Sequence, residues 1–465
     1  MIPLFDIPEI VQHYAGHFNE VFSEEAFLQF QRYVSGLIVS ENKTVEGINR
    51  LFVLDTRNQS SLNRLLTQSP FSVEALNRAR LEMLARLPGT QVKSRGVLSI
   101  DDTLLKHYGQ HFEQIALLYD STERRYVWAH NLVNLHYSDD QTDYPVAFRL
   151  WRPADLERIE AGFREAGVPM RQGKLALKQA DPKKWRQYLL GLWRRKQNRP
   201  EVKRLYQSKL ILAEELLRGF VVAYPALKLP VVFDNWYTQP AFCRFIDKTL
   251  KRPYVGTLAS DDQVQLAAGP VSLKRFAAHL KDEHQHRGKT VFGKLTIRYK
   301  GERQTYYSYC QSHRIKTFGK QRLVINHRQE DLSDSPAFYI SNRLHWQAPG
   351  ITRIRRHRWP VEVYHEEGKA DGLDQYQLRG FAAIIRHIAL VAVVYSLLRA
   401  AQHDKALLQR LQGQVETKLD GTAGSWRRST QAQALWSFAV LVSTALSQGQ
   451  PLEEVMLPVL RALCY

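Results

Sequence analysis

Three charged side chains suited to phosphoryl chemistry lie within the segment Arg355–Lys369. They are Arg358, Glu362 and Lys369, and on a helix turning about 100° per residue they share one face. The carboxylate can hold a divalent cation, and the two cations can hold phosphate. The alternative is a solvated helix face whose charges pair with one another.

Two further acidic positions follow apolar runs that we expect to be buried strands. Asp101 and Asp102 come after GVLSI, and Asp234 comes after LPVVF. The carboxyl ends of such strands meet at one edge of an α/β sheet, so these acids are expected to converge with Glu362. Three carboxylates there would repel one another unless cations bound between them, and two Mg²⁺ roughly 4 Å apart would satisfy them. The alternative role for such an aspartate is to cap a turn or helix.

The first acid is either Asp101 or Asp102. The pattern Asp-x-Thr, with Thr103 as the hydroxyl, favours Asp101, whereas alignment on Asp-Thr favours Asp102. We favour Asp101. Glu366 and Glu367 compete with Glu362, but neither keeps its spacing from the flanking cations.

The surrounding sequence predicts an α/β fold with helical regions at both ends. Pro360 suits a first helical turn, so a helix is expected from about Trp359. Alternating apolar patterns predict strands from Gly96 to Trp151 and a β-rich block near the middle of the chain. The predicted division is 1–94, a helical DNA-binding region or a helical cap; 95–250, the first part of the core; 251–350, a β-rich insertion; 351–400, the second part of the core; and 401–465, a helical C-terminal region.

The composition points to a polyanionic partner. Among 465 residues, 65 Lys and Arg exceed 46 Asp and Glu, which leaves a net charge of +19. A protein this basic usually meets nucleic acid, with an anionic membrane surface as the second candidate. The segment KKWRQYLLGLWRRKQNRPEVKRL mixes cations with Trp185 and Trp193, which suits a phosphate backbone; a solvated amphipathic helix is the alternative.

Cysteine usage and hydropathy indicate a cytoplasmic protein. The three cysteines are widely spaced and form no CxxC, which fits a reducing compartment. The first residues, MIPLFDIPEIVQHY, have no basic segment before an apolar run, so no signal peptide is expected. The longest apolar run, Ile388–Leu398, is too short to cross a bilayer and predicts a buried helix rather than a membrane anchor.

These motifs together resemble the DDE transposases of bacterial insertion sequences. The group with an RNase H-like core interrupted by a β-rich insertion carries the signature Tyr-x2-Arg-x3-Glu-x6-Lys, and this chain has Arg358-x3-Glu362-x6-Lys369. Arg355 stands where the signature has Tyr, and an arginine there could also contact phosphate. IDDT and VVFDNWY resemble the first and second acid segments. The resemblance spans about residues 95–400.

The resemblance implies a metal-dependent DNA transposase. Asp101, Asp234 and Glu362 would hold two Mg²⁺, for which Mn²⁺ could substitute, while Arg358, Lys369 and Arg355 would bind DNA phosphates. The partners would be double-stranded DNA, both transposon ends and target, and a second copy of the chain in a dimer on DNA. The protein would be bacterial and cytoplasmic, associated with the nucleoid when bound to DNA. Two other functions stay open: a structure-selective endonuclease on the same core, and a catalytically silent DNA-binding derivative.

Overall fold

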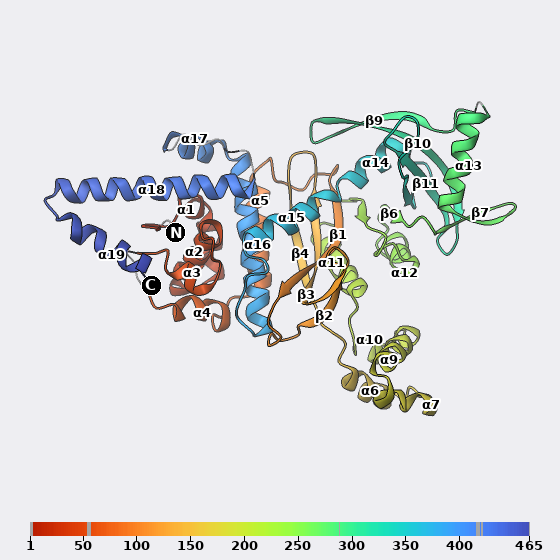
Figure 1. Cartoon of the computed structure of the whole chain (residues 1–465), viewed down its shortest axis with the longest axis horizontal. Coiled ribbons are helices and arrows are strands. Elements are labelled where there is room, and N and C mark those ends of the chain that lie inside the picture. Colours follow the sequence, from red (N-terminus) through yellow and green to blue (C-terminus); the bar gives the residue numbers. More distant parts are fainter. Residues whose placement is uncertain (1–2, 54–56, 288, 415–418, 420–421, 465) are drawn as a thin grey trace.

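The computed structural model describes the chain except residues 1–2, 54–56, 288, 415–418, 420–421 and 465. A mixed sheet lies in the middle of the molecule, with the N-terminal and C-terminal helices gathered at one end and the β-rich part at the other (Figure 1). This arrangement confirms the predicted α/β class with an RNase H-like core and helical terminal regions.

Six strands form the core part of the sheet. The long strand β3 pairs antiparallel with β1 on one side and with β2 and β4 on the other. Strand β1 then pairs parallel with β5, and β5 pairs parallel with β6. The core strands are β1 (Val97–His107), β2 (Ala116–Asp120), β3 (Arg125–Ser138), β4 (Asp143–Trp151), β5 (Val231–Phe233) and β6 (Tyr254–Leu258).

The sheet continues without a break into the β-rich part. Strand β12 pairs antiparallel with β6, so β6 joins the core to the strands beyond it. Because β6 lies parallel to β5, it belongs to the core arrangement although the predicted insertion begins at residue 251; the domain division itself stays a prediction. The remaining elements here are β7 (Gln263–Leu266), β8 (Gly269–Ser272), α13 (Leu273–His286), β9 (Gly293–Tyr299), β10 (Glu302–Ile315), β11 (Gly319–His327) and β12 (Ala337–Ser341).

Helices cover both faces of the core strands. Helix α11 packs on β3 and β4, and α15 packs on β1, β3 and β4. Helix α14 lies against β9 and β10, with contacts to β5 and β6. The helices after β4 are α6 (Leu156–Glu165), α7 (Gln172–Leu175), α8 (Leu177–Ala180), α9 (Pro182–Lys196), α10 (Pro200–Lys203), α11 (Lys209–Ala223), α12 (Pro240–Arg244), the π-turn η2 (Phe245–Thr249), α14 (Ala348–Arg356) and α15 (Trp359–Ala370).

Helix α16 (Phe381–His403) is the predicted buried apolar helix, and the structure confirms it. Within the described residues it alone is long and apolar enough to cross a membrane, but 83% of that apolar window is buried inside the protein. Its neighbours include α2, α4 and α5, so the N-terminal helices share its core. Their predicted DNA-binding role stays a prediction.

The remaining helices complete the two ends of the chain. They are α1 (Glu9–Ala15), η1 (Gly16–Val21), α2 (Glu24–Val39), α3 (Val45–Asn49), α4 (Ser60–Thr67), α5 (Val73–Arg86), α17 (Lys405–Gln414), α18 (Ala423–Ser447) and α19 (Leu452–Cys464).

His387 joins α16 to two other segments inside the core. Its Nε2 lies 2.7 Å from the Gly372 carbonyl oxygen, which can only accept, so Nε2 carries the proton and Nδ1 accepts from the Tyr33 hydroxyl at 2.8 Å. Burial lowers the pKa of His387 from 6.5 to about 4. The His387 ring is therefore neutral in the folded protein at neutral pH.

We predict that the fold loses stability as the pH falls from about 6.5 toward 4. Over this window the unfolded state binds a proton that folded His387 does not, so this residue alone removes about 2 kcal/mol by pH 5. Guanidinium unfolding at pH 7 and pH 5 measures the loss. His387→Gln should flatten the pH dependence, whereas replacement of the exposed His111 with Gln should not; equal slopes for all three proteins would contradict the assignment.

Candidate active site

Asp101 and Asp234 lie side by side at the point where β5 ends. In the parallel register Ile100 pairs with Phe233, and each aspartate is the next residue on its strand. Strand β1 itself continues to His107 because β3 pairs with its whole length. The prediction that the first strand ends at the acids is therefore wrong. Asp101 does, however, directly follow Ile100, the last residue of β1 that pairs with β5.

Helix α15 brings Arg358 and Glu362 to this place. It begins at Trp359 with Pro360 in its first turn, as predicted, and Arg358 occupies the N-cap position. The Arg358 guanidinium donates to Asp101 Oδ2 through Nη1 and to Glu362 Oε1 through Nη2. One cation thus bridges two of the three predicted acids, and only 13% of its side chain is exposed.

The electrostatics of Asp101 reflect a crowded, poorly hydrated position. Burial raises its pKa to about 7, with a further rise from neighbouring Asp234 and Asp102, while Arg358 acts in the opposite direction. A buried carboxylate near like charges favours its neutral form unless a cation compensates it. Arg358 is that cation in this structure.

Asp102 points to the opposite face of the sheet, as alternation along a strand requires. It accepts from Lys209 Nζ at 2.9 and 3.0 Å, from the Tyr237 hydroxyl at 2.8 Å and from Asn131 Nδ2 at 2.6 Å. These donors use both of its oxygens and fix the start of α11 to β1. The two candidates for the first acid therefore lie in different environments: Asp101 pairs with Arg358, and Asp102 is surrounded by donors from other segments.

The other predicted phosphate-binding residues lie at different distances from the acids. Arg355, on α14, donates from Nε to Thr257 Oγ1 at 3.0 Å; burial chiefly lowers its pKa, and Arg358, Glu362 and Asp101 are among the charges that act on it. Lys369 lies near the far end of α15. Burial lowers the pKa of Lys369, and the charges with most effect on it are Asp374 and Lys106, neither of them one of the three acids.

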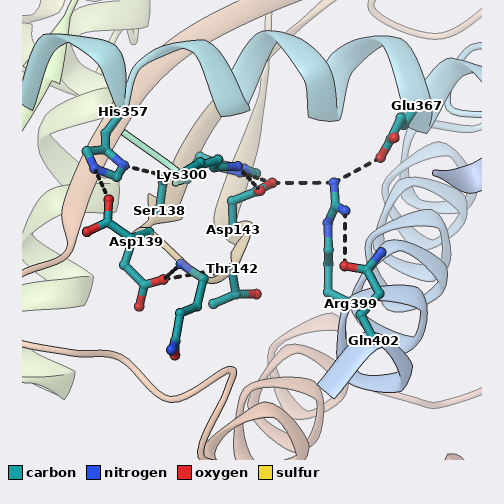
Figure 2. A network of polar contacts seen from close by, with 12 residues as sticks. Ser138, Asp139, Thr142, Asp143, Lys300, His357, Glu367, Arg399 and Gln402 are labelled. Atoms are coloured by element: carbon teal, nitrogen blue, oxygen red, sulfur yellow. Dashed lines mark hydrogen bonds and ion pairs between the residues drawn. The ribbon is translucent and has the colours of Figure 1, made fainter. Parts of the chain in front are cut away.

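The junction between α14 and α15 is clamped to the sheet by His357. Its carbonyl oxygen accepts from Ser99 Oγ at 2.9 Å, and its Nδ1 lies 2.9 Å from Ser138 Oγ (Figure 2). Burial lowers the pKa of His357 to about 4. Because His357 directly precedes Arg358, these bonds fix the position of the Arg358 backbone, from which the bridging side chain extends.

A buried ion network holds the rest of α15 (Figure 2). Asp143, at the start of β4, lies 3.0 Å from Lys300 Nζ and 3.6 Å from Arg399 Nη2. Arg399, on α16, also donates to Glu367 of α15 at 3.0 Å. Burial alone would raise the pKa of Asp143, but Arg399, His136 and Lys300 hold it well below its usual value. The network ties α15 and α16 to the core sheet.

Lys300 reaches this network from the β-rich part of the chain. Lys300 and Gly301 form the two-residue turn between β9 and β10, with φ of 47° and 88°. A turn of this kind needs positive φ at both positions, which favours Gly at the second. The turn places the Lys300 ammonium against the core strand β4, so the β-rich part is anchored near the site.

Comparison with known sequences decides the family. The family described as DDE superfamily endonuclease matches residues 17–279, more than half of the chain. The chain belongs to this family. No curated protein matches it. The matched range includes Asp101, Asp102 and Asp234 and ends before Glu362, and the finer Tyr-Arg-Glu-Lys signature group stays a prediction.

Membership in the DDE endonuclease family implies a DNA substrate and a divalent metal. Within the described part of the chain, no three His, Cys, Asp or Glu side chains are grouped closely enough to hold a metal ion. Asp101 and Glu362 nevertheless fit a cation, because Arg358 already lies between them as a positive charge. Its Nε is buried and has no hydrogen-bond partner among the residues described, so the bridge leaves one donor unused.

Sequence reasoning missed the residues that position the acids. Lys209, Tyr237 and Asn131 around Asp102, and Arg399 and Asp143 behind α15, come from segments far apart in the chain. Arg399 alone carried a signal, since it is one of two arginines in the apolar helix α16. A cation in such a helix is expected to have a buried partner.

Arg399→Met should destabilise the protein strongly. The substitution leaves Asp143 buried with one cation fewer and removes the partner of Glu367, which typically costs about 3–5 kcal/mol. Chemical unfolding at pH 7 measures the difference. The control is Arg410→Met, because Arg410 forms a surface pair with Glu9, and such pairs contribute about 0–1 kcal/mol. Equal losses in the two variants would contradict the network's role.

Arg358→Met should make the protein more dependent on Mg²⁺. Without the guanidinium, Asp101 and Glu362 lose their compensating charge, so the melting temperature in EDTA falls by a few degrees, as expected for a loss of about 1–2 kcal/mol. Mg²⁺ should restore more of this loss than it adds to the wild type at the same ionic strength. Asp101→Asn in the Arg358→Met background should abolish the gain; an equal Mg²⁺ effect in wild type and Arg358→Met would contradict the competition between Arg358 and metal.

Proposed function

We propose that this DDE endonuclease is a cut-and-paste transposase that binds insertion-sequence ends, cleaves them and joins them to target DNA. The observation that carries the proposal is the bridge that Arg358 forms between Asp101 and Glu362, with Asp234 in register beside Asp101. Asp101 adjoins Asp234 through the β1–β5 register and adjoins Glu362 through the guanidinium. Such acids with a nearby phosphate-binding cation are the parts that phosphodiester cleavage requires.

In the proposed mechanism Asp101, Asp234 and Glu362 would hold divalent cations, two Mg²⁺ by preference. Such cations lower the pKa of an attacking hydroxyl and offset charge on the phosphodiester. Arg358 then exchanges its carboxylate partners for a DNA phosphate, and its unused Nε supplies one of the donors. Arg355 adds a second cation from α14. Lys369 would contact phosphate farther along the strand, in keeping with its distance from the acids.

Asp101 is the proposed first acid, and Asp102 the residue that positions it. Asp102 already accepts from Lys209, Tyr237 and Asn131, so its oxygens are occupied by protein donors. Asp101, by contrast, has Arg358 as its charged partner on the side of α15. The proposal therefore places metal binding on the α15 face of the sheet.

Transposition joins two DNA ends, so we expect a homodimer assembled on DNA. Support comes from the C-terminal helices, where Leu435, Trp436 and Val440 of α18 are 49–59% exposed. Apolar side chains exposed together commonly mark interaction surfaces. The N-terminal helices would supply part of the end recognition, as their sequence pattern predicts.

Glu362→Gln tests the proposal directly, because it keeps the size of the side chain and removes its charge. On DNA carrying the element's ends, in Mg²⁺, the variant should bind like wild type while cleavage and strand joining fall at least roughly a thousandfold. The control is Glu366→Gln, one turn later on the exposed side of α15, which should cut within a few fold of wild type.

Each other result has a distinct meaning. Cleavage by Glu362→Gln at the wild-type rate would remove Glu362 from the site. Wild-type protein that cuts but never joins the cut end to new DNA would instead indicate the endonuclease alternative.

A further inference from the structure

The helices α6–α10 form a small body of their own beside the core sheet (Figure 1). Their apolar side chains make a separate cluster that includes Ile159, Phe163, Trp185, Leu189 and Trp193. We call residues 152–206 the helical module. The cluster lies mostly inside the module, with Ile211 of α11 added to it, and the module's outer surface carries mainly polar and charged side chains.

The helical module carries almost half of the protein's net charge. Residues 152–206 contain 15 Lys and Arg against 6 Asp and Glu, a net charge of +9, whereas the whole chain has +19. Trp185 and Trp193 are 2% and 3% exposed, so they pack inside and do not present rings to a ligand. Of the two interpretations of this segment, the burial of the rings favours the amphipathic helix over a surface of mixed cations and aromatic rings, and most of its cations face solvent.

The module's cations meet the core at a groove of about 770 Å³. Arg158, Lys203 and Arg204 line it from the module, and Arg149 and Arg152 line it from the end of β4. All five side chains are exposed. Across the described ranges, none of the five forms an ion pair with a carboxylate, although Arg152 lies over the Phe381 ring at 4.4 Å.

The two acids that line the same groove already have donors. Asp155 caps α6 by accepting from the Arg158 backbone N–H at 3.0 Å. Glu215 accepts from Gln207 Nε2 at 2.7 Å. Five cations against two engaged carboxylates leave a concave surface with excess positive charge, which suits a ligand with several phosphates.

The groove is close in the chain to the acid site. Gln207 lines the groove, and Lys209, two residues later, donates to Asp102 beside Asp101. A polyanionic strand that passes along the start of α11 would therefore approach β1 on the α11 face of the sheet, opposite the α15 face on which metal binding is proposed.

We propose that this groove is a second DNA site, which holds phosphates of the bound DNA away from the cleaved bond. The inference rests on the proposed function only in taking DNA as the substrate. Arg158, Lys203 and Arg204 bind consecutive phosphates through charge-assisted hydrogen bonds, and Arg149 and Arg152 extend the contact onto the core. The helical module then acts as a clamp beside the active site.

The test compares two triple variants that remove the same charge. The groove variant is Arg158→Gln/Lys203→Gln/Arg204→Gln, and the control is Lys174→Gln/Lys183→Gln/Arg195→Gln, whose three residues are exposed on the same module and do not line the groove. Binding of a fluorescent 30-base-pair duplex is measured by anisotropy in EDTA between about 50 and 200 mM salt. The absence of metal separates this test from the test of catalysis.

The groove variant should bind at least about tenfold more weakly at the lower salt concentration, and its logarithmic salt dependence should flatten by roughly two to three, since each lost phosphate contact removes about 0.9. The control should lose less than threefold and keep its slope within one. Equal losses in both variants would show that net charge alone attracts DNA and would overturn the proposal, as would wild-type binding by the groove variant. Thermal unfolding confirms that both variants fold, and Glu362→Gln should bind like wild type here even if the proposed catalysis is wrong.

Discussion

Repulsion among partly buried carboxylates is the constraint on which this site depends. Asp101 and Asp234 are neighbours in register, and Glu362 approaches through Arg358. Burial and the neighbouring carboxylates of Asp234 and Asp102 raise the pKa of Asp101 to about 7, so its charged form is disfavoured there. Arg358 compensates the charges of Asp101 and Glu362 through its two ion pairs. In the proposed function, the same side chain would also bind a DNA phosphate.

That arrangement requires α15 to be held in place along its whole length. His357 fixes its start through Ser99 and Ser138, and Arg399 fixes its later turns through Glu367. The buried carboxylate of Asp143 pairs with both Arg399 and Lys300. Since buried charges are stable only when paired, loss of one partner weakens the others. The network therefore connects α16, the β-rich part and the candidate site through one carboxylate.

The helical module differs from the candidate site in that most of its charged side chains are exposed. Its core is apolar and most of its charge lies outside, while Tyr206 and Ile211 connect its packing to the rest of the protein. Under the two proposals, the exposed cations of the groove would hold the DNA strand, and the partly buried carboxylates would take part in bond cleavage. Exposed cations suit the holding of a strand because they remain hydrated and can exchange counterions for phosphates.

Local patterns in the sequence were enough for the α/β class, the start of α15 beside Pro360 and the burial of α16, because periodicity and capping act over a few residues. They also indicated the acids and Arg358 as a set, through spacing and family resemblance, and membership in the DDE family is confirmed. The length of β1, the opposite directions of Asp101 and Asp102, and the partners of Asp143 depended on tertiary structure. Those features are set by strands and helices separated by many residues, and β1 extends past its acids only because β3 pairs with it to the end. Periodicity likewise does not show whether a tryptophan among cations faces solvent or a neighbouring helix, and packing buried Trp185 and Trp193 inside the module. The sequence by itself determined which residues could do chemistry, and tertiary structure decided which of them meet, because side chains far apart in the chain come together only through the packing of the sheet and its helices.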